Sequence, residues 1–137
     1  MDATLRIVLL VAAWLLAGYV AVAYYKAGSF KLTAPIAKLV EAGMSWTKEI
    51  PAFLVRVIAM LEILGAAGVI FAPAASEFLG WTWANAFAIL AAGGLALTML
   101  VGAIMHIVRG EFKYTWKINT QLFLAPLVLT VLFVIAL

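Results

Sequence analysis

Four long runs of apolar residues, separated by short polar segments, dominate the chain. The runs cover about residues 5–25, 51–72, 83–108 and 118–137. Each can supply the roughly 20 helical residues that cross the ~30 Å hydrocarbon core of a bilayer. The runs are continuously apolar, whereas strands of a membrane β-barrel alternate between apolar and polar side chains. The pattern predicts an all-α transmembrane fold, with a single membrane domain over residues 1–137 built as an antiparallel four-helix bundle.

Prolines mark the second and fourth runs. Pro51 favours the first turn of a helix, where its missing N–H would have no intrahelical partner. We expect the second span to close before Pro73. Pro126 lies inside the fourth span and leaves the Leu122 carbonyl without its usual donor, which predicts a kink there.

A short amphipathic interfacial helix is predicted between the first two spans, at about residues 34–44. Thr33 is a good cap residue, and apolar side chains recur at helical spacing after Pro35. Such a helix lies on the membrane, either as a cover over the bundle end or as a partner-docking or gating element. The candidate partner or interface surface is formed by Lys31, Pro35, Lys38 and Trp46.

The composition agrees with a membrane protein. Hydrophobic residues make up 68% of the chain and charged residues 11%, against about 45–50% and roughly 25% in soluble domains. There is no cysteine, which excludes disulfides and thiolate chemistry. The net charge of +3 comes from residues spread over the connections, so it favours contact with membrane lipids and no nucleic acid.

The basic residues also predict the orientation. Those in the first and third connections are Lys26, Lys31, Lys38, Lys48, Arg109, Lys113 and Lys117, against Arg6 alone on the other side. Positive residues stay in the cytoplasm. We therefore expect an integral protein of the bacterial inner (cytoplasmic) membrane, with both termini outside the cytoplasm.

The first run has a second interpretation. Ala21-Val22-Ala23 resembles a signal-peptidase site, and Arg6 would suit a short basic leader. Asp2 offsets the charge of Arg6, so we expect a retained helix.

The spans contain polar side chains that a bilayer disfavours. Apart from Arg6 at the start of the first span, the residues within them that carry charge near neutral pH are Arg56, Glu62 and His106, and each charge costs about 2.5–3.5 kcal/mol at the centre of the membrane. Glu62 should therefore be protonated or paired, as a hydrogen-bond clamp between helices or as a site that binds a ligand or moves a proton. Together with Asn119 and Gln121, these residues predict a polar core or binding pocket that opens to the cytoplasm.

Several kinds of chemistry have no motif here. The chain has no Gly-rich phosphate loop, no nucleophile triad and no cluster with metal-ligand spacing, and it has one histidine. We therefore assign no catalytic residue, no metal ligand and no required cofactor. A quinone or a lipid remains a candidate ligand.

A set of residues over essentially the whole chain resembles the DoxX-like family of small four-helix membrane proteins. These residues are Ala27-Gly28, Lys31-Leu32, Arg56, Glu62-Ile63-Leu64-Gly65, Pro73, Ala103, His106 and Arg109-Gly110-Glu111. The resemblance implies a left-handed antiparallel four-helix bundle. It implies scattered roles: a membrane subunit of a thiosulfate:quinone oxidoreductase, an associate of redox-stress enzymes, or an assembly chaperone for receptor channels. Without cysteine the chain cannot run thiol–quinone chemistry.

Three functions follow, and the first is favoured. It is a non-enzymatic membrane module (subunit, scaffold or assembly chaperone) that binds a protein partner or a second copy of itself. The alternative is a quinone- or lipid-binding membrane subunit of an oxidoreductase, in which Glu62 and His106 hydrogen-bond a head group. The third is a small-solute transporter, for which only Pro126 suggests a broken helix.

Overall fold

The protein is helical almost throughout. The computed structural model describes residues 1–137. Its elements are α1 (Ala3–Thr33), α2 (Ile36–Glu41), the 3₁₀ helix η1 (Ser45–Lys48), α3 (Ala52–Leu79), α4 (Ala84–Val108) and α5 (Phe112–Ala136). The four longest helices are long and apolar enough to cross a membrane. The predicted all-α transmembrane fold is confirmed.

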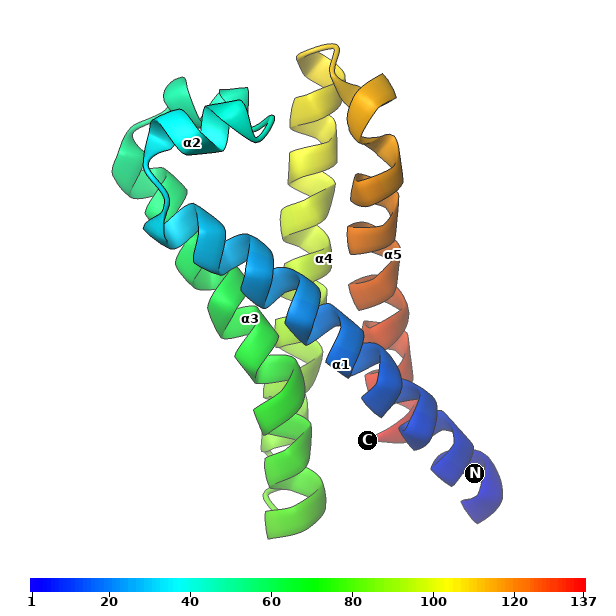
Figure 1. Ribbon diagram of the computed structural model, residues 1–137. Helices are drawn as coiled ribbons and strands as arrows, with labels where there is room; N and C mark the ends of the chain where they lie inside the picture. The colour runs from blue at the N-terminus through cyan, green and yellow to red at the C-terminus, as the bar shows by residue number, and fades with distance from the viewer.

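The four long helices form a ring. α1 packs against α3 and α5, and α4 packs against the same two helices. Short connections join α3 to α4 and α4 to α5, so these neighbours run antiparallel. Both chain termini lie at one end of the bundle and α2 lies at the other (Figure 1). Toward the α2 end, α1 and α3 diverge from α4 and α5 (Figure 1).

Buried stripes that contain several small residues allow α1 and α3 to approach one another. The buried residues of α1 are Ala13, Ala17, Val20, Tyr24, Gly28 and Lys31. Those of α3 are Val55, Ala59, Glu62, Ala66, Val69, Pro73 and Ser76. Both sets repeat every three or four residues, the spacing of one helix face. Such stripes give the van der Waals contact that holds helices together in lipid, where apolar burial supplies little driving force.

Polar contacts tie the helices together at the end that carries the termini. The Arg6 Nη2 atom lies 3.0 Å from Glu77 Oε1 of α3, and Arg6 Nε donates to the Ala136 carbonyl of α5 at 3.1 Å. Asn85 Nδ2 of α4 donates to the Leu137 carbonyl at 3.3 Å. All four long helices therefore contribute to the contacts at this end.

The sequence predicted that the second span ends before Pro73, and this prediction is wrong. α3 continues through Pro73 to Leu79 and ends at Gly80, whose φ of 72° is left-handed. Proline removes one backbone donor, but neighbouring turns carry a membrane helix past it. The residue that stops the helix is Gly80, since it adopts the left-handed conformation at no steric cost.

Pro126 leaves one carbonyl of α5, that of Leu122, without an intrahelical donor, and the Tyr24 hydroxyl donates to it. Proline has no N–H to give the Leu122 carbonyl. The Tyr24 hydroxyl of α1 donates to that carbonyl and also lies 3.2 Å from the Leu95 carbonyl of α4. Tyr24 and Pro126 are both fully buried. The backbone hydrogen bond that α5 lacks at Leu122 is therefore replaced by one from a side chain of α1.

The connection at the α2 end is more folded than a single helix. The short amphipathic helix is present as α2, and Gly43, with φ 96°, turns the chain into η1. Leu39 of α2 packs in a small cluster with Ala34 and Val55, which holds α2 on the start of α3. α1 runs to Thr33, so Lys31 belongs to a bundle helix.

Candidate functional site

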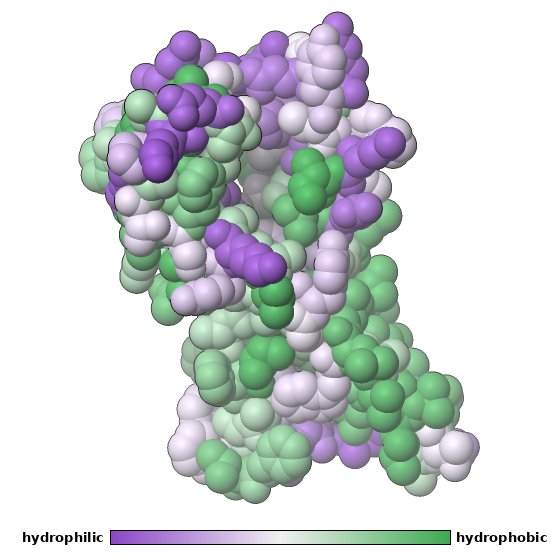
Figure 2. Space-filling model, in the orientation of Figure 1, coloured by the Kyte–Doolittle hydropathy of each residue, from purple (hydrophilic) through white to green (hydrophobic).

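A cavity of about 260 Å³ lies between α3 and α4 at the α2 end of the bundle. Its polar lining side chains come from three helices besides α3 and are Lys31, Glu62, Thr98, His106 and Asn119. Met44, just before η1, and Trp46, within η1, line it as well. Figure 2 shows a hollow in the molecular surface at this end, between α2 and the α4–α5 pair. Hydrophilic side chains gather around the same end (Figure 2).

Lys31 and Glu62 form a buried ion pair in the cavity wall. Lys31 Nζ lies 2.6 Å from Glu62 Oε1, and the two residues are 9% and 2% exposed. Glu62 Oε2 is buried and has no hydrogen-bond partner. The lysine therefore supplies an opposite charge from another helix, and the carboxylate keeps one bare oxygen in a cavity whose charges cancel.

Gly28 brings the two members of this pair together. A Cβ at Gly28 would lie 2.9 Å from the Ala59 carbonyl oxygen and 2.8 Å from Ile63 Cγ1. Only glycine lets α1 approach α3 this closely, one turn before Lys31. This close approach places Lys31 Nζ within hydrogen-bond distance of Glu62 Oε1.

Asn119 supplies a second bare polar atom. It lies in the second turn of α5 and is 5% exposed. Its Nδ2 atom is buried and has no partner. An unpaired buried donor costs about 1–3 kcal/mol. Two residues that line the cavity thus hold a buried polar atom without a hydrogen-bond partner, one an acceptor and one a donor.

Arg56 lies outside the cavity and caps a helix. Its Nη1 atom donates to the carbonyl of Lys31 and, at 2.8 Å, to that of Ala34. These carbonyls belong to the last turn of α1, where backbone acceptors lack intrahelical donors and a cation is favourable. Arg56 therefore fixes the turn from which the Lys31 side chain leaves.

His106 connects the cavity to an ionic cluster at its end. His106 Nδ1 lies 2.9 Å from Glu111 Oε2, and Arg109 Nε lies 2.9 Å from Glu111 Oε1. Arg109 also donates to Ser45 Oγ at 2.9 Å and to the Glu49 carboxylate. The cluster joins the α4–α5 turn to η1, which covers this end of the cavity.

The same contacts shift the ionisation of the cluster. Hydrogen bonds from His106, and then from Arg109, hold the pKa of the Glu111 carboxyl below its usual value. The hydrogen bond to Glu111 raises the pKa of the Arg109 guanidinium, which stays charged. Glu111 is therefore anionic at neutral pH.

The structure brings together most, but not all, of the residues singled out in the sequence. Glu62, His106 and Asn119 share the cavity. Gln121 is exposed on the outside of α5 and does not join them.

Of the proposed partner surface, Pro35 and Lys38 are exposed, whereas Trp46 lines the cavity. Lys31 is inside the bundle, which corrects its assignment to that surface. It turns inward because α1 continues past residue 25 and carries it on the buried face of the helix.

A signal for Lys31 is present in the sequence. Ala17, Val20, Tyr24 and Gly28 define one face of the first helix by spacings of three and four, and Lys31 follows at the next such step. The partners of Arg109 carry no comparable signal, because Ser45, Glu49 and Glu111 meet only once the connection has folded.

Comparison with known families places the chain among membrane proteins of this architecture. Residues 15–136 match the DoxX-like family. No curated protein and no solved structure matches the chain. The match covers all of the cavity residues and nearly the whole bundle. The chain is an integral membrane protein that belongs to the DoxX-like family.

Proposed function

We propose that this protein is a membrane subunit that binds the uncharged, oxygen-bearing head group of a lipid-soluble molecule, a quinone or its hydroquinone, in the cavity between α3 and α4. The observation that carries the proposal is the pair of bare polar atoms in the cavity wall, Glu62 Oε2 and Asn119 Nδ2.

The two bare atoms suit the two oxidation states of such a head group. A quinone carbonyl accepts a hydrogen bond from the Asn119 amide, and a hydroquinone hydroxyl donates to the Glu62 carboxylate. A ligand that pairs them recovers the desolvation cost of about 1–3 kcal/mol for each atom.

The rest of the lining favours an uncharged ring. The charge of Glu62 is balanced by Lys31, so an ionic head group would find no net attraction. Trp46, Met44 and Met105 add aromatic and thioether surface, which packs well against flat rings. We favour ligand binding over a module that only binds a protein partner. The interior of such a module would be tightly packed, whereas this one has a cavity lined by residues with unpaired polar atoms.

Binding of a short-chain quinone to the purified protein in lipid nanodiscs tests this. Quenching of Trp46 fluorescence reports occupancy, and a Trp46→Phe variant identifies that tryptophan's share of the signal. We expect saturable quenching, and about tenfold weaker affinity in Asn119→Leu, since one hydrogen bond is lost.

Gln121→Leu is the matched control, because it removes an amide from the same helix on the exposed side. It should bind as the wild type does. Absence of saturable binding in the wild type, or equal affinity in all three proteins, would contradict the proposal.

A further inference from the structure

The head-group cavity continues into an apolar groove between α3 and α4. A cavity of about 410 Å³ adjoins it and shares Thr98 in its lining. A further cavity of about 410 Å³ follows, sharing Gly68 and Phe87 with the second and reaching Trp81 and Trp83. We call these two cavities the α3–α4 groove.

The groove has a floor of small residues and a rim of large ones. Gly65, Gly68 and Gly94 line the floor. Leu64 and Leu90 form the rim and are 61% and 69% exposed. The Thr98 hydroxyl donates to the Gly94 carbonyl at 2.8 Å, so even the one polar side chain of the first part has its hydrogen bond made within the helix.

The glycines of the floor differ in what surrounds them. A Cβ at Gly65 would lie 2.5 Å from Leu95 Cδ2, and one at Gly68 2.7 Å from Ala91 Cβ, so these two set the approach of α3 to α4. A Cβ at Gly94 would meet nothing within 4 Å. Gly94 therefore keeps space open without being needed for helix packing.

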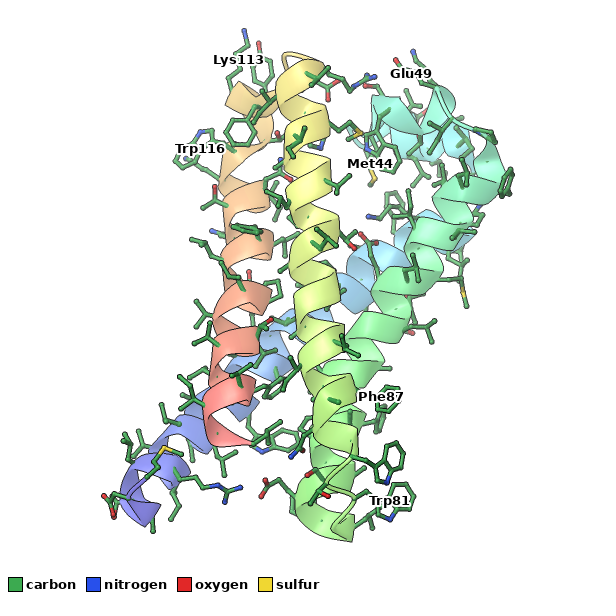
Figure 3. All side chains as sticks on the ribbon, turned by 180° about the vertical axis from the view of Figure 1, so that it is seen from behind. Met44, Glu49, Trp81, Phe87, Lys113 and Trp116 are labelled. Atoms are coloured by element: carbon green, nitrogen blue, oxygen red, sulfur yellow. The ribbon has the colours of Figure 1, made fainter.

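The dimensions suit a hydrocarbon chain. From Thr98 to Ala84 the groove follows α4 for about 21 Å, at 1.5 Å per residue. This is roughly two thirds of the ~30 Å hydrocarbon core. Figure 3 shows Met44 near the upper end of the space between α4 and α3, and Phe87 and Trp81 at its lower end.

We propose that the α3–α4 groove holds the long hydrocarbon or isoprenoid tail of the molecule whose head group occupies the cavity, and that this molecule enters sideways from the bilayer. The inference rests on the proposed function. The head cavity, at about 260 Å³, is smaller than the ~300–1,000 Å³ of sites that enclose a whole ligand. The remainder of a tailed ligand must leave the cavity, and the groove is its apolar continuation.

A series of quinones with one head group and increasing tail length tests the groove. Affinities are compared in nanodiscs at equal concentration of each quinone in the bilayer, so that partitioning does not enter. In the wild type we expect the long-tailed quinone to bind at least tenfold more tightly than the tail-less one. Gly94→Leu fills the groove and should reduce the long-tailed affinity to the tail-less value, while tail-less binding stays unchanged.

Gly18→Leu is the control, since Gly18 on α1 also has nothing within 4 Å of an added Cβ and lines none of the three cavities. It should leave the whole series unchanged. Raising the fraction of a nanodisc phospholipid whose tails match the longest quinone should not weaken quinone binding by competition, because its charged head group has no place in the cavity.

Equal affinity along the series, equal weakening of short and long quinones by Gly94→Leu, or competition by the phospholipid would overturn the tail assignment. The first of these results leaves head-group binding standing. Failure of every quinone, tailed or not, overturns the proposed function itself, so the two failures are distinguishable.

Discussion

The Tyr24 hydroxyl supplies a hydrogen bond that the backbone of α5 lacks. Pro126 leaves the Leu122 carbonyl without an intrahelical donor, and Tyr24 reaches it from the neighbouring helix α1. In the middle of a membrane no water replaces a lost donor. The Tyr24 hydroxyl therefore offsets the loss of the backbone hydrogen bond at Pro126 inside a spanning helix.

Tyr24→Phe should lower the stability of the protein in detergent by about 1 kcal/mol, since a buried carbonyl loses its donor. The effect should shrink in a Pro126→Ala background, because alanine restores the N–H that pairs with Leu122. Thermal unfolding of the two singles and the double measures this. Tyr25→Phe is the control, as Tyr25 is 59% exposed, and an equal loss from Tyr24→Phe in both backgrounds would refute the explanation.

At the residue scale, the sequence predicted which polar residues lie inside more reliably than it predicted their partners. Glu62 and Asn119 stand out because a long apolar run surrounds them. Helical spacing puts Lys31 on the buried face of α1. Its partner, Glu62, lies far away in sequence, and no local pattern predicts which residue it pairs with.

The close approach of α1 to α3 at Gly28 brings Lys31 and Glu62 together. Gly28→Ala should destabilise the protein by about 1–3 kcal/mol, because the new Cβ would contact the Ala59 carbonyl and push the helices apart. Gly18→Ala, where an added Cβ meets nothing within 4 Å, should be neutral or stabilising through higher helix propensity. Melting temperatures in one detergent compare the two, and similar losses would show that the close approach is not the cause.

At the element scale, four helices and the short helix between the first two were predictable, whereas helix ends were less so. Apolar runs indicate where lipid surrounds a helix. However, α1 continues beyond its apolar run to Thr33, and α5 begins at Phe112, several residues before its apolar run starts. The polar turns at these ends are stabilised by contacts such as the Arg56 cap. Hydropathy contains no information about such caps.

For the whole molecule, the ionic cluster around Glu111 fastens η1 to the α4–α5 turn. The folded protein holds the pKa of Glu111 below its ordinary value of 4.5. The stabilisation is therefore fully present above pH 4.5 and is lost as the pH falls through the lowered pKa. The melting temperature of the wild type should exceed that of Glu111→Gln at neutral pH, and the gap should close in acid.

Taking the difference in melting temperature between the wild type and Glu111→Gln removes the contribution of the other carboxyl groups, which both proteins contain. Differential scanning fluorimetry between about pH 7 and pH 3 is the measurement. A gap that does not change with pH would show that the Glu111 charge does not stabilise the cluster.

The orientation of the molecule remains a proposal: the α2 end faces the cytoplasm of a bacterial cell. Because the chain has no cysteine, single cysteines report it directly. A membrane-impermeant maleimide should label Thr82→Cys, between α3 and α4, in intact cells. Lys38→Cys on α2 should react only after permeabilisation, and the reverse pattern would invert the assignment.

The two ends of the bundle are held together by different kinds of contact. Arg6 holds the termini end through direct bonds to α3 and α5. The opposite end is closed by the side chains that link η1 to the α4–α5 turn. Loss of these side-chain contacts would uncover the α2 end of the head-group cavity, while the contacts of Arg6 would still hold α1, α3 and α5 together at the other end.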